Sequence, residues 1–351
     1  MNYAIILAGG AGTRFWPLSR EAQPKQFLSL CSDRPLIDLT LERIHKNVPG
    51  RNIYIATNKM YHKSVGSYLK RFGIPFKNVL FEPQARNTLA PIAVLSEIIY
   101  KRDKDAVILV LPSDHYMKNE KEFLRALDKA TSVANKGHIV TLGIKPDRPE
   151  TGYGYIKVSS GLRAQGSGQF YKVEKFIEKP DYGKAKMLIK SKRAYWNGGI
   201  FVFRADTIMG EIKRFQASDF RVIKSIKGKK DLNRIWSRFS PISIDYAVME
   251  KSKKLALVPC DCGWSDLGSW QAVEQFFRKD KSGNIFKDNC IDIGSKNIFC
   301  WPGRRILATV GLENIIIVDT DDALLVCAKN KAQDVKKIVQ ALEAKKLYRQ
   351  M

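Results

Sequence analysis

The chain has 351 residues, of which 44% are hydrophobic, and this composition excludes an intrinsically disordered protein. Its longest uncharged apolar stretches, such as Ile5–Ala8 and Ile315–Val318, are strand-length, far short of the roughly 18 to 20 residues that cross a bilayer. The net charge of +25 is compatible with a nucleic-acid partner, but the basic residues are spread along the whole chain.

The first part of the chain alternates strand and helix patterns. Apolar runs predict strands over Tyr3–Ala8, Asn52–Thr57, Val79–Phe81, Ala106–Leu111 and His138–Leu142. Apolar residues at helical spacing predict helices between them, over Leu36–Val48, Lys63–Phe72, Leu89–Ile99 and Glu122–Ala134. This order predicts an α/β fold, Rossmann-like, with a mostly parallel (mixed) sheet flanked by helices. Such sheets bind ligands beyond the carboxyl ends of their strands.

The pattern of predicted strands and helices changes twice further along the chain. From about Thr151 the expected elements have longer connections, namely the strands Tyr153–Val158, Phe170–Phe176 and Gly199–Phe203 and the helix Ile244–Glu250. After residue 280 come short strands, over Cys290–Ile293, Asn297–Trp301, Ile306–Val310, Ile315–Val318 and Leu324–Val326, and then a closing helix. We therefore predict two domains, residues 1–280 and residues 281–351, the second being a small coil of short strands.

A glycine-rich turn follows the first strand. It reads Ala8-Gly9-Gly10-Ala11-Gly12-Thr13-Arg14, and Lys25 follows within the same loop region. Backbone N–H groups of such a turn can approach phosphate oxygens closely, and two fixed cations beside them suit a triphosphate. The pattern is neither the dinucleotide fingerprint nor the P-loop, which disfavours a dehydrogenase or a P-loop ATPase. Taken alone, the turn is equally compatible with a tight corner.

Further motifs follow in order over residues 1 to about 270. They are Phe15-Trp16-Pro17-Leu18-Ser19-Arg20, Pro24-Lys25-Gln26-Phe27, Phe81-Glu82-Pro83-Gln84-Ala85-Arg86-Asn87-Thr88, Leu111-Pro112-Ser113-Asp114-His115, Thr151-Gly152-Tyr153-Gly154-Tyr155, Val173-Glu174-Lys175-Phe176-Ile177-Glu178-Lys179-Pro180, Tyr195-Trp196-Asn197-Gly198-Gly199-Ile200-Phe201, Ser243-Ile244-Asp245-Tyr246-Ala247-Val248-Met249-Glu250 and Gly263-Trp264-Ser265-Asp266-Leu267-Gly268-Ser269-Trp270. With these motifs the chain resembles the sugar nucleotidyltransferases, and among them the bacterial mannose-1-phosphate guanylyltransferases, also called GDP-mannose pyrophosphorylases.

The resemblance implies a reaction and a set of site residues. It implies transfer of GMP from GTP to α-D-mannose 1-phosphate by Mg²⁺-dependent in-line attack, which gives GDP-mannose and pyrophosphate. Catalytic roles are implied for Arg14, Lys25, Asp114 and Asp266. The two aspartates are the implied metal ligands, and Mg²⁺ typically takes one or two carboxylates and completes its shell with water and phosphate. The resemblance also implies that the C-terminal coil is a left-handed β-helix.

Two further groups of residues are implied to bind the substrates. Nucleotide binding falls on Gly9, Gly10, Gly12, Thr13, Glu82, Asn87 and Thr88. Sugar-phosphate binding falls on Gly152, Glu174 or Glu178, Lys179 and Asn197. Glu82 is the candidate for guanine, whose adjacent N1–H and N2–H donors a carboxylate accepts together. The family usually has serine where this chain has Gly198, which places the sugar contacts there in question.

Three alternatives remain open. The chain is also compatible with a nucleotidyltransferase for another sugar 1-phosphate or base, and with a non-catalytic regulatory homologue that binds nucleotide-sugars. A basic nucleic-acid-binding protein is the third, but the densest lysine run, residues 224–230, lacks interleaved aromatic residues.

The expected partners and location complete these predictions. We expect GTP and mannose 1-phosphate as partners, no nucleic acid, no membrane and, by family analogy, a homodimer. Six scattered cysteines and an N-terminus without a secretory pattern indicate free thiols in the cytoplasm. Some relatives carry a fused domain that isomerises the sugar phosphate, and we expect this chain to lack that activity because it ends at Met351.

Overall fold

The computed structural model describes residues 1–10, 12–161, 163–165, 168–226, 228–286 and 289–348. By internal contacts the chain forms two compact units. The sheet unit comprises Met1–Gly9, Leu41–Ser113 and Met117–Trp264, and the coil unit comprises Gly10–Thr40, Asp114–Tyr116 and Ser265–Met351. The division therefore does not follow the order of the chain, because the coil unit takes two short segments from the first part of the sequence. The domain boundary at residue 280 stays a prediction.

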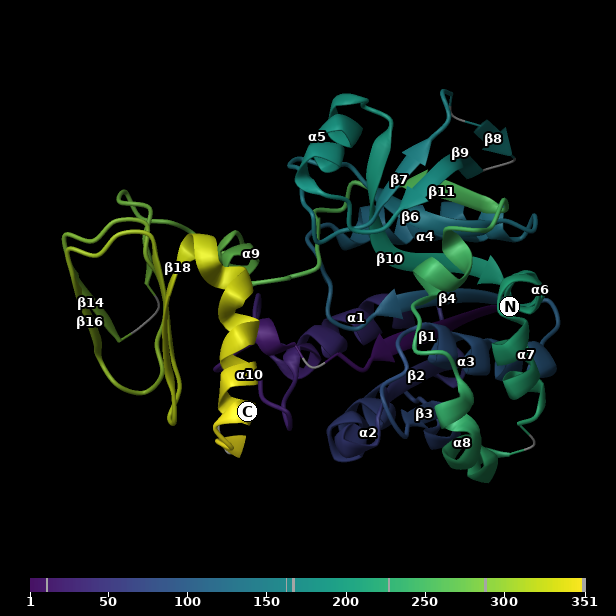
Figure 1. Ribbon diagram of the computed structural model, residues 1–351, viewed down its shortest axis with the longest axis horizontal. Helices are drawn as coiled ribbons and strands as arrows, with labels where there is room; N and C mark the ends of the chain where they lie inside the picture. The colour runs from purple at the N-terminus through teal and green to yellow at the C-terminus, as the bar shows by residue number, and fades with distance from the viewer. Residues whose placement is uncertain (11, 162, 166–167, 227, 287–288, 349–351) are drawn as a thin grey trace. The chain divides into compact units, whose positions relative to one another are not determined.

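One ten-stranded sheet organises the sheet unit. Its strands are β1 (Asn2–Ala8), β2 (Ile53–Asn58), β3 (Val79–Glu82), β4 (Val107–Pro112), β6 (Ile139–Ile144), β7 (Tyr155–Val158), β8 (Arg163–Gln165), β9 (Gly168–Ile177), β10 (Ala194–Arg204) and β11 (Leu255–Pro259). β1 pairs parallel with β2 and β4, and β2 pairs parallel with β3. β10 lies antiparallel between β4 and β6, and β9 pairs antiparallel with β7, β8 and β11 (Figure 1). The sheet is therefore mixed, and the prediction that it is mostly parallel is wrong, because only the strands of the first part of the chain and the β6–β11 pair are parallel. Two short strands, β5 (Tyr116–Met117) and β12 (Trp264–Ser265), lie outside it.

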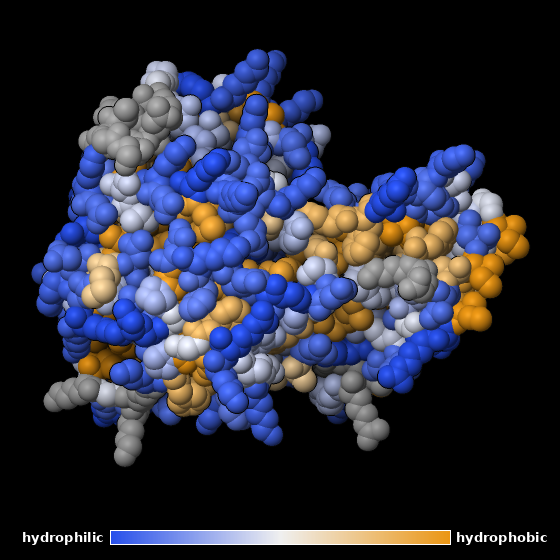
Figure 2. All heavy atoms as spheres, turned by 180° about the vertical axis from the view of Figure 1, so that it is seen from behind, coloured by the Kyte–Doolittle hydropathy of each residue, from blue (hydrophilic) through white to orange (hydrophobic). Residues whose placement is uncertain are grey.

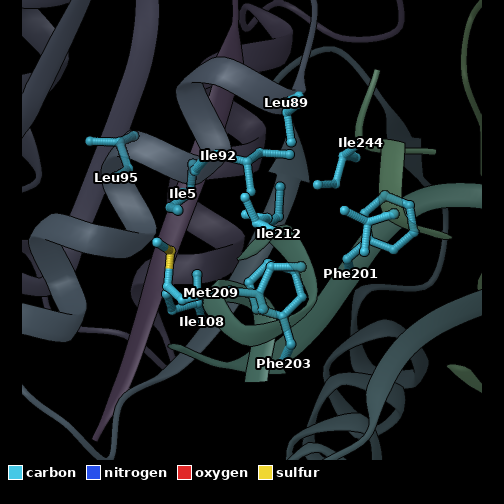
Figure 3. Packing of buried hydrophobic residues seen from close by; sticks show 14 of the residues in the cluster. Ile5, Leu89, Ile92, Leu95, Ile108, Phe201, Phe203, Met209, Ile212 and Ile244 are labelled. Carbon is cyan, nitrogen blue, oxygen red and sulfur yellow. The ribbon is translucent and has the colours of Figure 1, made fainter. Parts of the chain in front are cut away.

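The sheet unit also contains helices. They are α2 (His62–Arg71), α3 (Leu89–Arg102), α4 (Glu120–Ala134), α5 (Tyr182–Lys190), α6 (Ala205–Phe215), α7 (Ala217–Lys224) and α8 (Lys229–Ile235), and α1 (Leu36–His45) has residues in both units. Ile92 of α3 and Met209 of α6 pack with Ile108 and Phe203 of the sheet in one buried cluster (Figure 3). The expected helix at Ile244–Glu250 is a π-helix, η7 (Asp245–Met249), a form that often marks functional sites.

The C-terminal strands form a β-helix-like coil. They are β13 (Ile285–Phe286), β14 (Cys290–Ile293), β15 (Phe299–Trp301), β16 (Leu307–Val310), β17 (Ile315–Asp319) and β18 (Leu324–Ala328). β13, β15 and β17 pair in parallel, as do β14 and β16, so successive turns of the chain stack. Buried Asn284 stabilises one corner, since its amide donates to Ser295 O and accepts from Ile298 N. α9 (Trp270–Glu274) precedes the coil, and η8 (Lys329–Val335) and α10 (Lys336–Ala344) follow it.

Apolar side chains gather on one outer face of the coil (Figure 2). Ile291 and Ile293 of β14 and Val310 of β16 are each more than half exposed. The register places Ile293 beside Val310, so these side chains form a continuous row. In the described part of the chain, no helix is long and apolar enough to cross a membrane.

Candidate active site

The glycine turn after β1 is shaped by a left-handed residue. Gly12 has φ 64°, and a Cβ built on it would lie 2.8 Å from the backbone nitrogen of Lys25. Only glycine fits both demands. The chain then turns through η1 (Thr13–Phe15), where the Phe15 ring is buried and the Arg14 side chain is exposed. Ala11, at the centre of the predicted loop, lies outside the described residues.

This turn lines a polar cavity of about 240 Å³ within the coil unit. The cavity is lined by Gly12, Thr13, Arg14, Phe15, Lys25, Asp114, His115, Asp266, Leu267 and Gly268. The structure thus brings together Arg14, Lys25, Asp114 and Asp266, the four residues with predicted catalytic roles. They come from three segments that are far apart in the sequence.

Lys25 is the electrostatic centre of the cavity. Its ammonium group donates to Asp114 Oδ2 at 2.7 Å and to the Asp266 carbonyl oxygen, and only 8% of its side chain is exposed. Burial alone would raise the pKa of Asp114, but the charges of Lys25 and His115 and the hydrogen bond from Lys25 lower it below its usual value. Asp114 is therefore ionised at neutral pH.

The Asp266 segment is a tight turn anchored in the core. Leu267 is fully buried and has φ 47°, a rare conformation for a branched side chain. The Gly268 N–H donates to Asp266 Oδ1 at 3.0 Å, and a Cβ at Gly268 would lie 2.8 Å from Asp266 Oδ2. The hydrogen bond from Gly268 thus fixes the direction of the Asp266 carboxylate, and a side chain at position 268 would displace that carboxylate.

In the sheet unit, the predicted nucleotide residues lie at the ends of two strands: Gly9 follows β1, Glu82 ends β3, and Asn87 and Thr88 come after β3. Burial raises the pKa of Glu82 to about 7, and a Cβ at Gly9 would lie 3.4 Å from Glu82 Oε1, so the carboxylate adjoins the end of β1. Asn87 has φ 60°, and its side chain accepts from Thr88 N. The Thr88 hydroxyl accepts from Ile244 N at 2.9 Å, which ties this turn to η7.

A second polar cluster in the sheet unit gathers around Asn197. The Asn197 backbone N–H donates to Gly154 O at 2.8 Å, and its side-chain amide donates to Asp245 Oδ1 at 2.9 Å. A Cβ at Gly154 would meet Glu178 Oε2, so Gly154 leaves room for that carboxylate. Lys179, with φ 44°, pairs with Glu178 at 3.3 Å and is 61% exposed.

The other two predicted sugar-binding residues, Glu174 and Gly152, have contacts with residues outside the Asn197 cluster. Glu174 pairs with Lys157 at 3.3 Å and with Arg193 at 3.8 Å. Gly152 is exposed, and its N–H donates to Glu150 Oε1. Of the two glutamates left open by the sequence, the contacts favour Glu178.

Comparison with known proteins shows which families the chain resembles. Residues 3–283 match the nucleotidyl transferase family, and residues 288–342 match the mannose-phosphate isomerase/GMP-like β-helix domain. The chain is 39% identical over 348 residues to the xanthan biosynthesis protein XanB of Xanthomonas campestris pv. campestris strain B100, and 37% identical over 353 residues to mannose-1-phosphate guanylyltransferase 2 of Escherichia coli O157:H7. Each alignment covers 97% of this chain and 73% of the relative.

A solved structure agrees over nearly the whole chain. The crystal structure described as mannose-1-phosphate geranyltransferase from Thermus thermophilus matches with a TM-score of 0.89 and 32% identity, covering 97% of this chain and 99% of that one. The chain belongs to the nucleotidyl transferase family. The resemblance read from the motifs is thereby confirmed, as are the mixed-sheet fold and the β-helix-like C-terminal domain.

Asp245 belongs to the polar cluster around Asn197, and the sequence analysis did not assign it a role. Its burial, with the nearby charge of Glu178, raises its pKa to about 6, and its side chain accepts from Asn197. Its motif, Ser243-Ile244-Asp245-Tyr246, supported the resemblance but received no role. A buried acid that titrates near neutrality beside other polar groups is a candidate for ligand contact.

Aromatic rings form a second group that the sequence left unassigned. Tyr153 lies edge-on to Trp196 at 5.1 Å and to Trp264 at 5.3 Å. The Arg148 guanidinium lies over the Trp196 ring at 5.1 Å. These rings come from the same three motifs as Gly152, Asn197 and Asp266, which is the signal that would have drawn attention to them.

Gly198 stands where the family usually has serine. A side chain at this position would not face the polar cluster around Asn197. A Cβ built there lies 3.2 Å from the Leu142 carbonyl oxygen and 3.7 Å from Ile144 Cγ1, so it points toward β6. A serine hydroxyl at this position would meet β6 backbone. The absence of that hydroxyl therefore removes no group from the Asn197 amide and its partners.

Proposed function

We propose that this chain transfers GMP from GTP to α-D-mannose 1-phosphate and releases pyrophosphate. The observation that carries the proposal is the joint presence of Arg14, Lys25, Asp114 and Asp266 around one cavity of the coil unit. The relatives named as mannose-1-phosphate guanylyltransferases support the choice of base and sugar.

The cavity suits transfer of a nucleotidyl group without a side-chain nucleophile. The sugar 1-phosphate oxygen is already anionic and attacks the α-phosphorus of GTP in line. Gly12, Thr13 and Arg14 stabilise the departing pyrophosphate, and Lys25 neutralises charge that develops in the transition state. Lys179, exposed and beside Glu178, binds the phosphate of the incoming sugar.

The two aspartates fit Mg²⁺. Asp114 is ionised at neutral pH, and both it and Asp266 present oxygen donors to the cavity. Within the described residues no three His, Cys, Asp or Glu side chains gather at metal-binding distance, and a two-carboxylate site suits an ion that keeps water and phosphate in its shell. When bound, Mg²⁺ would polarise the phosphate oxygens.

Base and sugar contacts are assigned to the sheet unit. We assign guanine recognition to Glu82 and place Asn87 and Thr88 beside it in the nucleotide-binding turn. Since Glu82 accepts the two adjacent N–H donors of guanine together only as a carboxylate, and its pKa is raised to about 7, GTP binding should weaken as the pH falls below 7. We assign the sugar hydroxyls to Glu178, Asn197 and Asp245, whose carboxylates and amide suit a polyol.

The deciding experiment measures pyrophosphate release with Mg²⁺ over a grid of nucleoside triphosphates and sugar 1-phosphates. We expect the dominant signal for GTP with mannose 1-phosphate. A dominant signal for another pair would retain the mechanism but overturn the specificity. No release anywhere in the grid, together with tight binding of GDP-mannose, would identify a regulatory homologue. The same grid should be repeated from pH 6 to pH 8 with Glu82→Gln, which should lack the loss of GTP affinity at low pH.

The homodimer is proposed to form through the outer face of the C-terminal coil. The exposed row that includes Ile291, Ile293 and Val310 offers an uncharged surface that a second copy can cover. Ile293→Lys should then shift the mass measured by light scattering from dimer to monomer, and a monomeric wild-type chain would contradict the proposal. The left-handed sense of the coil and the cytoplasmic location also stay predictions.

A further inference from the structure

The cavity and the C-terminal domain belong to the same compact unit. Its lining residues come from Gly10–Thr40, Asp114–Tyr116 and the start of Ser265–Met351, and that last segment continues into the β-helix-like coil. Phe15 and Leu267, which line the cavity, share a buried cluster with Phe299 and Val318 of the coil. The side chains behind the cavity therefore include those of the C-terminal domain.

Trp270 connects these parts directly. It is fully buried, and its indole N–H donates to the Trp16 carbonyl oxygen at 3.2 Å. The Phe15 ring packs edge-on against it at 5.3 Å, and the Trp301 ring of β15 lies 5.7 Å away. Trp270 lies only four positions after Asp266. A shift of α9 would therefore move both the Asp266 turn and the Phe15–Trp16 segment, which contribute to the cavity or contact its lining.

A buried ion pair anchors the other end of α9. Glu274, the last residue of this helix, pairs with Lys329 at 2.8 Å, and their side chains are 6% and 8% exposed. Lys329 also donates to Asn297 Oδ1 at 2.7 Å, and Lys279 pairs with Glu274 from a more exposed position. Buried pairs contribute little net stability compared with apolar residues of the same size, and their best-attested use is to select one arrangement.

We propose that Lys329 is a positioning residue for the reaction. Through Glu274 it fixes α9 and thereby holds the Asp266–Gly268 turn in the geometry that the cavity requires. The C-terminal domain then contributes to catalysis by holding the Asp266–Gly268 turn in place. Because Lys25 donates to the Asp266 carbonyl oxygen, a displaced turn also displaces Lys25. The inference rests on the proposed nucleotidyl transfer.

The test compares Lys329→Met with the double variant Lys329→Met/Glu274→Gln. The single variant leaves the buried Glu274 carboxylate paired only with Lys279, which is partly exposed. We therefore expect a lower Tm and a displaced Asp266–Gly268 turn. The double variant removes that charge and should recover most of the Tm, yet the anchor is still absent. We expect both variants to lose about 10- to 100-fold in kcat and to need more Mg²⁺, with KM for mannose 1-phosphate unchanged.

Calorimetric binding of inorganic pyrophosphate without metal supplies a readout other than turnover, and both variants should bind it several-fold more weakly. Arg305→Met is the matched control, because Arg305 pairs with buried Asp319 in the same coil but neither residue lines the cavity. A double variant with wild-type kcat, Mg²⁺ requirement and pyrophosphate affinity would overturn the positioning role. If the wild-type chain binds pyrophosphate but transfers no GMP, the proposed function fails while the calorimetry still decides the role of Lys329. If the wild-type chain binds no pyrophosphate without metal, the kcat and the Mg²⁺ requirement of the double variant decide the role of Lys329.

Discussion

The two units of the molecule arrange their acidic side chains in opposite ways. In the coil unit, Asp114 lies 2.7 Å from Lys25, and its pKa is lowered. In the sheet unit, burial and the nearby charge of Glu178 raise the pKa of Asp245 to about 6, although Asp245 accepts a hydrogen bond from the neutral amide of Asn197. One site compensates a negative charge with a buried lysine, whereas the other places two acids close together with the exposed Lys179 beside Glu178.

This difference matches the ligands that each unit is proposed to bind. Phosphates and their metal need fixed charges of both signs, and a permanently ionised aspartate provides one of them. A sugar ring is neutral and presents hydroxyl groups, which acids and amides bind through hydrogen bonds without a compensating cation. Each of the following predictions changes one side of this comparison.

The largest effect is expected from removing the ionised acid of the coil unit. Asp114→Asn keeps an oxygen that Lys25 can donate to, so the fold should survive, but the proposed metal ligand loses its charge. We expect kcat to fall by about 10³-fold or more with little change in Tm. Asp322→Asn is the control, since it neutralises another ion-paired aspartate of the same unit, the partner of Arg20. Near wild-type turnover of Asp114→Asn at low Mg²⁺ would refute the metal assignment.

Backbone shape in the coil unit can be tested with two neighbouring glycines. Gly12→Ala should lower the free energy of unfolding by about 1–3 kcal/mol, because φ 64° is unfavourable for alanine and its Cβ would collide with Lys25. Gly10→Ala should leave Tm unchanged, since nothing lies within 4 Å of a Cβ there. Thermal unfolding of both variants measures the contrast. Equal Tm values would show that the turn does not depend on Gly12.

The sequence predicted the coil-unit cavity better than the sheet-unit cluster. Distinctive motifs contain the four cavity residues Arg14, Lys25, Asp114 and Asp266. The residue types and the order of these motifs were therefore enough to predict that the four residues belong to one site. Asp245 acquires its raised pKa only from burial and from Glu178, which lies far away in the sequence. The Lys329–Glu274 pair joins residues 55 positions apart and has no local pattern at all. Contacts between distant segments are what the sequence alone could not supply.

An intermediate effect is expected from Asp245→Asn. Losing an ionised acceptor should raise KM for mannose 1-phosphate about 10- to 100-fold, with a smaller change in kcat. The pKa of Asp245 is about 6 in the fold against an ordinary value of 3.8, so the wild-type chain loses stability as the pH rises from about 4 to 6. The variant lacks this loss, and its Tm relative to wild type should therefore be higher at pH 8 than at pH 4. A Tm difference that does not vary with pH would contradict the raised pKa.

The smallest effect is expected from Gly198→Ser, which restores the residue that the family usually has. The new Cβ would lie 3.2 Å from the Leu142 carbonyl oxygen, so β6 must move by a few tenths of an ångström, or the hydroxyl must donate to that oxygen. These two effects oppose each other, and we expect a change in unfolding free energy within about 1 kcal/mol. KM for mannose 1-phosphate should stay at the wild-type value, because the side chain faces β6 and not the Asn197 cluster. Steady-state kinetics decides the point. A several-fold fall in KM would mean that residue 198 acts on the sugar after all, so the polar cluster of the sheet unit would extend beyond Glu178, Asn197 and Asp245.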